Sequence, residues 1–493
     1  MKVLLVYTVS EGPEPPRRPI LEWIEISFAV SYLAGALKRA GHEVELLVLR
    51  HGRFEQEVLE TIERFQPGLI GYTAVATEFE FIKRIAGFVS HERPELYQII
   101  GGAHVTLRPE DALEGAFDAV CLGEGEDALI ELAETLERGQ APAGIQNLWL
   151  RGPDGEVERN PTRPFVPELD ALPIADREIW RPWIEENPKH TILIARGCPF
   201  TCTYCSNHAL WKVAPGKYVR FRSVENVIAE LDQLVEEFPD ASYCYFEVET
   251  VSADEAWARR FAAALEEWNG RRELPMEFAI NLRVLRHHSF ASLFEVLSSA
   301  GFSYLRIGIE SGSERVRREV LERHETNEEL TRCFEEAQEA GLEVFAYNLI
   351  GMPGETPEDF EETIALNQHP AVTRSYLSIF YPYPGTKLEQ VCADRGIDVP
   401  PLQNCAERHR AYLSLPEFPN RRIESYYRRF FSLVHGSDLS LFQRADEYVW
   451  RTIRGYPRIE RVARRLRGRG VMTRFRKAGH AMKSVLGAGN QAS

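Results

Sequence analysis

Short apolar segments alternate with amphipathic segments along residues 1–140. The expected strands are Val3–Tyr7, Val44–Leu49, Gly68–Tyr72, Gln98–Ile100 and Asp118–Leu122. The expected helices are Ser27–Ala40, Glu55–Phe65, Phe79–Val89 and a segment from about Glu126 to Leu136. Strands separated by helices of this length form a parallel sheet with right-handed crossovers. We therefore expect residues 1–140 to be a doubly wound α/β domain of flavodoxin or Rossmann type.

Residues 141–190 interrupt this alternation. Trp149–Leu150 and Val157 flank a turn at Pro153-Asp154-Gly155, which predicts a β-hairpin. Prolines then follow at positions 161, 164, 167, 173, 182 and 188. Because clusters of proline interrupt regular structure, this segment is expected to link two domains.

A second alternation of strands and helices covers residues 191–390. Its expected strands are Thr191–Ala195, Tyr243–Glu247, Met276–Asn281, Tyr304–Ile309, Glu343–Leu349 and Tyr376–Phe380. Six such units indicate a partial, open (β/α)6 barrel, and active sites of parallel barrels lie at the C-terminal ends of the strands. Residues 391–493 are expected to form a helical C-terminal domain that covers the barrel mouth.

Composition and charge exclude several classes of protein. Hydrophobic residues make up 44% of the chain and charged residues 27%, as in an ordinary globular protein. The net charge of −16 disfavours a nucleic-acid partner, because phosphate binding needs a surplus of Lys and Arg. The first residues lack the features of a signal peptide, and no apolar run is long enough for a membrane span. We therefore expect a cytoplasmic protein.

Eight cysteines in such a protein do not indicate a disulfide framework. Five occur singly and are expected to be buried, namely Cys121, Cys244, Cys333, Cys392 and Cys405. The other three, Cys198, Cys202 and Cys205, follow a predicted strand directly and so lie on one loop at the barrel mouth. Three thiolates on one loop can hold an iron–sulfur cluster and leave one iron open, whereas a structural zinc site would use four ligands.

The segment Cys198-Pro199-Phe200-Thr201-Cys202-Thr203-Tyr204-Cys205 resembles the signature of the radical S-adenosylmethionine (SAM) superfamily. The resemblance implies a [4Fe-4S] cluster on the three cysteines. It also implies reductive cleavage of S-adenosylmethionine to a 5′-deoxyadenosyl radical, which abstracts hydrogen from an unactivated carbon. An electron donor such as flavodoxin or ferredoxin would then be needed.

Further segments in residues 190–390 resemble the SAM-binding segments of that superfamily. By this resemblance Tyr204 contacts the cofactor, and Glu247 and Glu249 bind the amino group of its methionyl part. Asn281 and Arg283 are expected to bind the methionyl carboxylate. Glu310 and Ser311 are expected to bind the ribose, and Gly351 is expected to lie beside the adenine.

The N-terminal domain is similar to that of the cobalamin-binding branch of the superfamily. The similarity rests on Gly101-Gly102 after one predicted strand and Gly123-Glu124-Gly125 after the next, and these five residues are expected to bind cobalamin. Glycines let the backbone approach a bulky planar ligand, although tight turns of any flavodoxin-like domain also use them. The loop from Thr8 to Pro13 has no histidine, and His104 lies elsewhere, so no protein histidine is expected on cobalt.

The resemblance makes cobalamin-dependent methyl transfer to an unactivated carbon the main functional hypothesis. Coupling, cyclisation or rearrangement of a lipid or tetrapyrrole-like substrate is the alternative, and a non-catalytic cobalamin or redox sensor is a third. Residues 444–493 contain 13 Lys or Arg against 3 Asp or Glu. This basic tail is either a helix on a membrane surface or a helix packed on the acidic body.

Overall fold

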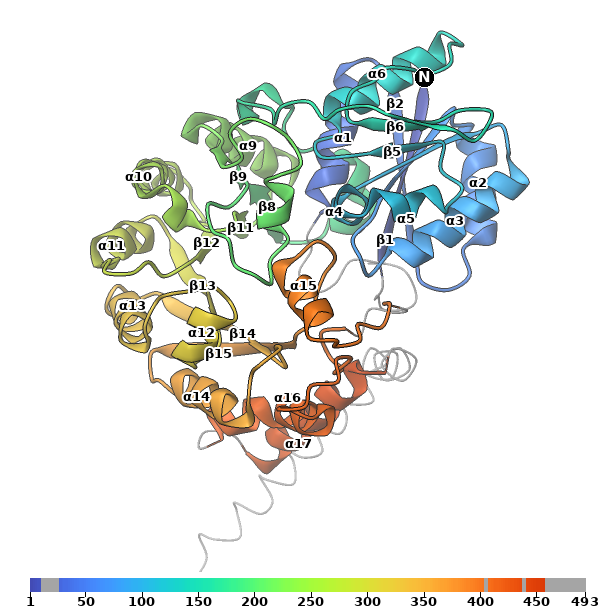
Figure 1. Cartoon of the computed structure of the whole chain (residues 1–493). Coiled ribbons are helices and arrows are strands. Elements are labelled where there is room, and N and C mark those ends of the chain that lie inside the picture. The colour runs from blue at the N-terminus through green and yellow to red at the C-terminus, as the bar shows by residue number, and fades with distance from the viewer. Residues whose placement is uncertain (10–25, 403–406, 437–439, 457–493) are drawn as a thin grey trace, which may run out of the picture.

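Two β-sheets, each built mainly of parallel strands and flanked by helices, lie side by side, and the last helices pack below the second sheet (Figure 1). The computed structural model describes residues 1–9, 26–402, 407–436 and 440–456. Part of the loop from Thr8 to Pro13, as well as Cys405 and most of the basic tail, lie outside the described residues.

The first sheet contains seven strands in the order β2-β1-β3-β4-β5-β6-β7. They are β1 (Lys2–Val9), β2 (Glu43–Arg50), β3 (Leu69–Thr73), β4 (Tyr97–Gly101), β5 (Ala119–Cys121), β6 (Leu148–Arg151) and β7 (Val157–Arg159). Strands β1 to β5 are parallel. The order 2-1-3-4-5 is that of flavodoxin-like sheets, and ligands bind where the strand order reverses.

Helices cover both faces of this sheet. They are α1 (Phe28–Arg39), α2 (Glu55–Phe65), α3 (Phe79–Glu92), α4 (Ala103–Leu107), α5 (Pro109–Leu113) and α6 (Glu126–Glu137). The apolar side chains of α1 and α6 join one core, and those of α2 and α3 join a separate core on the other face. The predicted doubly wound domain is confirmed.

The predicted hairpin is formed by β6 and β7, which pair in antiparallel fashion. Strand β6 also pairs with β5, in antiparallel fashion as well. The hairpin therefore extends the first sheet to Arg159, beyond the boundary at residue 140 that the sequence pattern suggests.

The second sheet contains six parallel strands in the order β8-β11-β12-β13-β14-β15. They are β8 (Lys189–Leu193), β11 (Tyr243–Glu247), β12 (Glu277–Leu282), β13 (Phe302–Glu310), β14 (Glu343–Ile350) and β15 (Val372–Ile379). Within the described residues β8 and β15 do not pair, so the barrel is open, as predicted. A two-stranded ribbon of β9 (Ala195–Arg196) and β10 (Arg220–Phe221) stands beside it.

Outer helices surround the barrel strands. They are α9 (Val224–Glu237), α10 (Glu255–Gly270), α11 (Ala291–Ser299), α13 (Asn327–Glu339) and α14 (Pro357–Asn367). The short helix α8 (Asn207–Leu210) lies against α4 of the first domain, and the short helix α12 (Glu314–Glu319) follows the end of β13. Alternate residues of β11 show the two faces of the sheet: Cys244 and Phe246 join the core beneath the helices, whereas Tyr243 and Tyr245 join an aromatic cluster inside the barrel.

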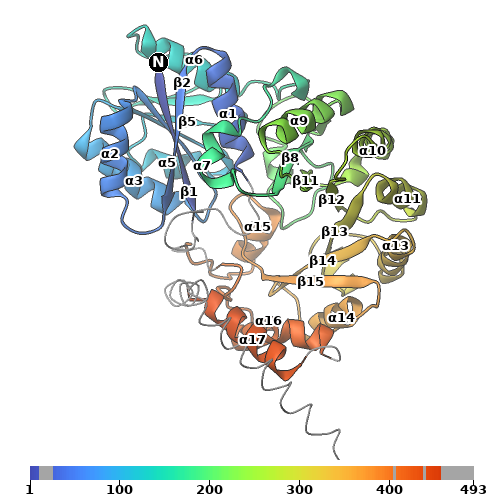
Figure 2. The ribbon, with the colours of Figure 1, turned by 180° about the vertical axis from the view of Figure 1, so that it is seen from behind.

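The linker carries the short helix α7 (Arg181–Ile184), which lies beside the first domain (Figure 2). Trp180, directly before α7, is fully buried and donates a hydrogen bond from Nε1 to Ser31 Oγ of α1 at 2.8 Å. Nearby, the buried carboxylate of Glu230 on α9 pairs with Arg177 of the linker at 2.6 Å and with Arg222. The linker is therefore part of a core that both halves share.

The C-terminal helices are α15 (Lys387–Asp394), α16 (Asn420–His435) and α17 (Leu441–Arg454). Tyr427 and Phe430 of α16 pack in a cluster with Ile379 of β15 and Phe360 of α14. Among the helices that the structure describes, none is long and apolar enough to span a bilayer.

Replacement of Glu230 by Ala should destabilise the protein by about 3–5 kcal/mol, because it leaves two guanidinium groups buried without a countercharge. Urea denaturation followed by tryptophan fluorescence measures the effect. Glu236→Ala, at an exposed position of the same helix, is the matched control and should change the midpoint little. Equal midpoints for the two variants would contradict the importance of this ion cluster.

Candidate functional site

The three clustered cysteines lie on the loop between β9 and α8, at the C-terminal end of β8. Gly197 begins this loop with φ +86°, a conformation that favours glycine. A Cβ atom at this position would lie only 2.3 Å from the carbonyl oxygen of Tyr218. The cysteine loop can therefore pack directly on the backbone that precedes β10 only with glycine at this position.

Hydrogen-bond donors surround two of the three sulfur atoms. Arg283 Nη1 lies 2.8 Å from Cys202 Sγ, and the backbone and side-chain nitrogens of Asn207 each lie 3.5 Å from Cys205 Sγ. Burial raises the pKa of the Cys198 thiol to about 12 and that of Cys205 to about 11. Coordination to a metal deprotonates a thiol, and the donors around Cys202 and Cys205 stabilise the resulting thiolates.

In the described part of the chain, no three His, Cys, Asp or Glu side chains converge on one point that an ion could occupy. A cubic iron–sulfur cluster binds each thiolate at a different iron, so its ligands need not converge.

A chain of charged groups connects the cysteine loop with the end of β13. Arg323 lies 3.3 Å from the hydroxyl of Tyr204, 3.5 Å from the carboxylate of Glu310 and 2.6 Å from that of Glu325. Glu325 in turn lies 3.8 Å from Arg283. The sequence pattern did not identify Arg323 and Glu325, because they lie on the loop after α12 and not at a strand end.

Glu310 is held in an unusual conformation at the last position of β13. Its φ of +65° is uncommon for a residue with a side chain, and such strain is found at functional sites. Burial raises the pKa of its carboxyl group, and the guanidinium of Arg323 offsets part of this rise. A glutamate with this geometry is suited to hold a polar ligand at the barrel mouth.

The ends of β11 and β12 bring three further predicted residues to the same edge. Glu247 is the last residue of β11, and the exposed Glu249 follows it at the wall of a cavity. Asn281 donates a hydrogen bond from Nδ2 to the Val248 carbonyl at 2.9 Å and so joins the two strand ends.

Gly351, after β14, lies under the C-terminal helix α16. Its φ is +86°, and a Cβ atom there would lie 3.1 Å from Ile423 Cδ1. Its backbone nitrogen donates a hydrogen bond to Glu355 Oε2 at 2.6 Å. Burial raises the pKa of the fully buried Glu355 to about 8.

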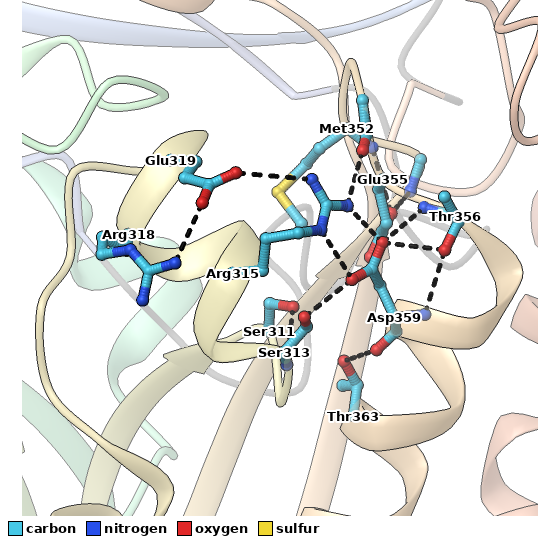
Figure 3. A network of polar contacts seen from close by, with 12 residues as sticks. Ser311, Ser313, Arg315, Arg318, Glu319, Met352, Glu355, Thr356, Asp359 and Thr363 are labelled. Carbon is cyan, nitrogen blue, oxygen red and sulfur yellow. Dashed lines mark hydrogen bonds and ion pairs between the residues drawn. The ribbon is translucent and has the colours of Figure 1, made fainter.

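Ser311 belongs to the scaffold next to this loop (Figure 3). It is fully buried, and its hydroxyl accepts a hydrogen bond from the Ser313 backbone nitrogen at 3.2 Å. Ser313 donates to Asp359, which also pairs with Arg315. Ser311 is thus placed where it supports the loop, with its hydroxyl engaged by the protein.

A cavity of about 380 Å³ separates the first domain from the cysteine loop. It is within the size range of ligand pockets and has largely apolar walls. The predicted cobalamin residues Gly101, Gly102, Gly123, Glu124 and Gly125 line one side. The barrel supplies Arg196, Gly197, Asn207 and Tyr218, and no histidine is among the described residues that line the cavity.

The glycine turns fit a bulky flat ligand at this position. Gly102 has φ +105°, and a Cβ atom there would lie 2.5 Å from the Ala74 carbonyl oxygen. Gly123 has φ +77°, and a Cβ atom there would lie 3.6 Å from Val213 Cγ1, which also lines the cavity. Side chains at these two positions would strain the turns or narrow the cavity.

Glu124 joins the two domains at the floor of the cavity. It pairs with Arg196 at 2.9 Å and with Arg220 at 2.8 Å, and it accepts a hydrogen bond from the Val166 backbone nitrogen at 2.7 Å. Burial acts to raise the pKa of Glu124, but the two guanidinium groups outweigh it and the pKa lies below its usual value. Arg196 also pairs with Glu126 at 2.6 Å.

Other candidate residues have packing roles. His104 stacks on Phe79 with ring centroids 4.3 Å apart and does not line the cavity. The single cysteines at positions 121, 244, 333 and 392 are buried and unpaired, as expected.

Replacement of Cys198, Cys202 or Cys205 by Ala should remove most of the cluster, which contains about four irons per chain when all three thiolates are present. Iron and sulfide analysis of anaerobically reconstituted protein measures the loss. The control, Cys333→Ala, removes a buried thiol far from the loop and should retain the iron. Retention of iron in the three loop variants would contradict the assignment.

Glu355 should make stability depend on pH. Its pKa rises from 4.5 to about 8 on folding, so the folded chain binds more protons than the unfolded chain within this window. The free energy of unfolding should therefore fall as the pH rises through the window, by at most about 1.4 kcal/mol per pH unit. Urea denaturation between pH 5 and 8 should show that Glu355→Gln loses this dependence, while Glu358→Gln, at an exposed position of α14, keeps it. A pH dependence unchanged in Glu355→Gln would refute the assignment.

Two family models match the chain, one on the first domain and one on the second. The B12 binding domain model matches residues 23–133, and the Radical SAM superfamily model matches residues 192–366. The first range covers the doubly wound domain from α1 into α6, without β1, and the second includes the cysteine loop and β13.

Relatives and a solved structure match most of this chain. An uncharacterized methyltransferase of Pyrococcus horikoshii is 26% identical over 79% of this chain and 83% of its own length. The anaerobic magnesium-protoporphyrin IX monomethyl ester cyclase of Rubrivivax gelatinosus is also 26% identical, over 82% of this chain and 73% of its own. The structure of the radical S-adenosylmethionine methyltransferase TsrM from Kitasatospora setae has the same fold, with a TM-score of 0.64, 20% identity and coverage of 80% and 76% of the two chains. The chain therefore contains a B12-binding domain followed by a radical SAM domain.

Proposed function

We propose that this protein transfers a methyl group to an unactivated carbon of a small-molecule substrate. The observation that carries the proposal is the cavity between the domains, because the glycine turns expected to hold cobalamin and the loop expected to hold the cluster face each other across it. When bound, the cluster supplies one electron for cleavage of S-adenosylmethionine, and cobalamin supplies the methyl group.

We assign the cluster to Cys198, Cys202 and Cys205. Arg283 stabilises the thiolate of Cys202, to which it donates. The same guanidinium lies 3.9 Å from the centroid of the Phe200 ring, so Arg283, directly after β12, contacts two residues of the loop.

We assign the binding of S-adenosylmethionine to the strand ends around the loop. Glu247 and Glu249 offer carboxylates to an amino group, and Glu310 offers one to ribose hydroxyls. Arg323 contacts both Glu310 and Tyr204 and holds them in place. We therefore add Arg323, as a positioning residue, to the S-adenosylmethionine site that the sequence suggested. We place the adenine beside the Gly351 turn, whose backbone packs against α16.

We assign cobalamin to the glycine turns at the C-terminal ends of β4 and β5, without a histidine on cobalt. In this proposal the carboxylate of Glu124 acts through Arg196 and Arg220, which fix the distance between the cavity and the cysteine loop. Glu124 is thus a positioning residue and not a direct ligand.

The names of the relatives support methyl transfer and leave one alternative. The Pyrococcus protein and TsrM are described as methyltransferases, and a structure of TsrM contains cobalamin and a [4Fe-4S] cluster. The Rubrivivax relative is a cyclase of a tetrapyrrole, so ring formation on such a substrate is the second candidate.

The proposal includes an electron donor and a cytoplasmic reaction. Contact with a lipid surface would involve residues 444–493, of which the structure describes only 444–456. There, Tyr448 and Val449 of α17 are exposed, as is Leu441, the first residue of this helix.

An anaerobic assay with reconstituted cluster, cobalamin and reductant tests the function. Methyl transfer should give both 5′-deoxyadenosine and S-adenosylhomocysteine, and a Cys202→Ala control should give no 5′-deoxyadenosine. Formation of 5′-deoxyadenosine without S-adenosylhomocysteine would rule out methylation and favour the cyclase alternative.

A further inference from the structure

Trp211 is an exposed aromatic residue close to the cysteine loop. It follows α8 directly, six positions after Cys205, and 43% of its surface is exposed. Its ring stacks on that of Tyr218, with centroids 6.1 Å apart and planes at 10°. Tryptophan is enriched among the residues that contribute most to the binding energy of protein interfaces.

A short series of contacts leads from Trp211 to a sulfur of the cluster loop. Tyr218 is buried, and its hydroxyl donates a hydrogen bond to Asn207 Oδ1 at 2.6 Å. The Asn207 side chain in turn donates to Cys205 Sγ at 3.5 Å. One stacking contact and two hydrogen bonds therefore connect the protein surface with a predicted cluster ligand.

The charge around Trp211 differs from that of the rest of the chain. The chain has a net charge of −16, yet residues 197–223 contain no Asp or Glu. Lys212 and Lys217 in this segment are exposed, and within the described residues neither lies in an ion pair. In contrast, the buried Arg220 is neutralised by Glu124. The segment thus offers unpaired positive charge at the surface.

We propose that Trp211, Lys212 and Lys217 form the docking surface for a small acidic electron-carrier protein. The inference rests on the proposed cluster at the cysteine loop. The carrier is oxidised by one electron and the cluster is reduced by one, with no bond formed or broken and no proton transferred. The lysines steer the acidic partner, and Trp211 forms the apolar centre of the contact.

Three variants of the holoenzyme test this docking surface, with an acidic flavodoxin as the probe. They are Trp211→Ala, Trp211→Phe and the double variant Lys212→Glu/Lys217→Glu. The matched control, Lys2→Glu/Arg271→Glu, changes the net charge equally at two positions outside this segment, one in β1 and one directly after α10. Stopped-flow bleaching of the cluster absorbance measures electron arrival from reduced flavodoxin or from dithionite, and calorimetry measures the affinity for oxidised flavodoxin.

The double lysine variant should lose about tenfold or more in affinity for flavodoxin and most of its salt dependence. Trp211→Ala should slow reduction by flavodoxin about tenfold, whereas Trp211→Phe should retain most of the rate because a ring can still stack. Reduction by dithionite should remain within about twofold of wild type in every variant, because a small reductant needs no docking surface.

Equal flavodoxin affinities and rates in the double lysine variant and its control would overturn the proposal, as would failure of wild-type protein to bind flavodoxin. If Trp211→Ala also lost reduction by dithionite while Trp211→Phe did not differ from wild type, Trp211 would be structural and its docking role would be refuted. The assay reads electron arrival at the cluster alone, so its result is independent of whether S-adenosylhomocysteine is formed.

Discussion

Arg196 pairs with two carboxylates of the first domain, Glu124 at 2.9 Å and Glu126 at 2.6 Å, and the cysteine loop begins at the next residue, Gly197. Arg220 adds a second guanidinium to Glu124. Desolvation of such charges is costly, and it is compensated only while every partner is present. The two halves therefore have one favourable arrangement, in which the strand ends of the first sheet lie against the start of the loop. The cavity between them exists because of this arrangement.

Charge is balanced in the same way at the mouth of the barrel. Arg283, Glu325, Arg323 and Glu310 alternate in sign from the cysteine loop to the end of β13, and Tyr204 completes the series. Each charge has an opposite neighbour, so the groups are fixed before any ligand arrives. Fixed dipoles and charges cost no reorganisation when a ligand binds, which makes them suited to a site for a charged cofactor.

The sequence predicted local features of this architecture well. Glu55–Phe65 and Tyr243–Glu247 form a helix and a strand with the predicted bounds, because their hydrophobic periodicity is set by neighbours in the chain. The cysteine motif is also local. The hairpin was predicted, but its pairing with β5, which extends the sheet to Arg159, was not. Arg323 and Glu325 escaped prediction, because their importance comes from partners on other loops and not from a pattern around them.

The segment 197–223 contacts the barrel mouth, the solvent and the cavity, so several of its residues have more than one structural role. Cys202 faces the barrel mouth, Trp211 faces solvent, and Tyr218 lies between the cavity and the surface. Asn207 connects them, since it donates to the cysteine loop, accepts from Tyr218 and lines the cavity. A change at Asn207 would therefore act on the ligand environment, the cavity wall and the aromatic contact together.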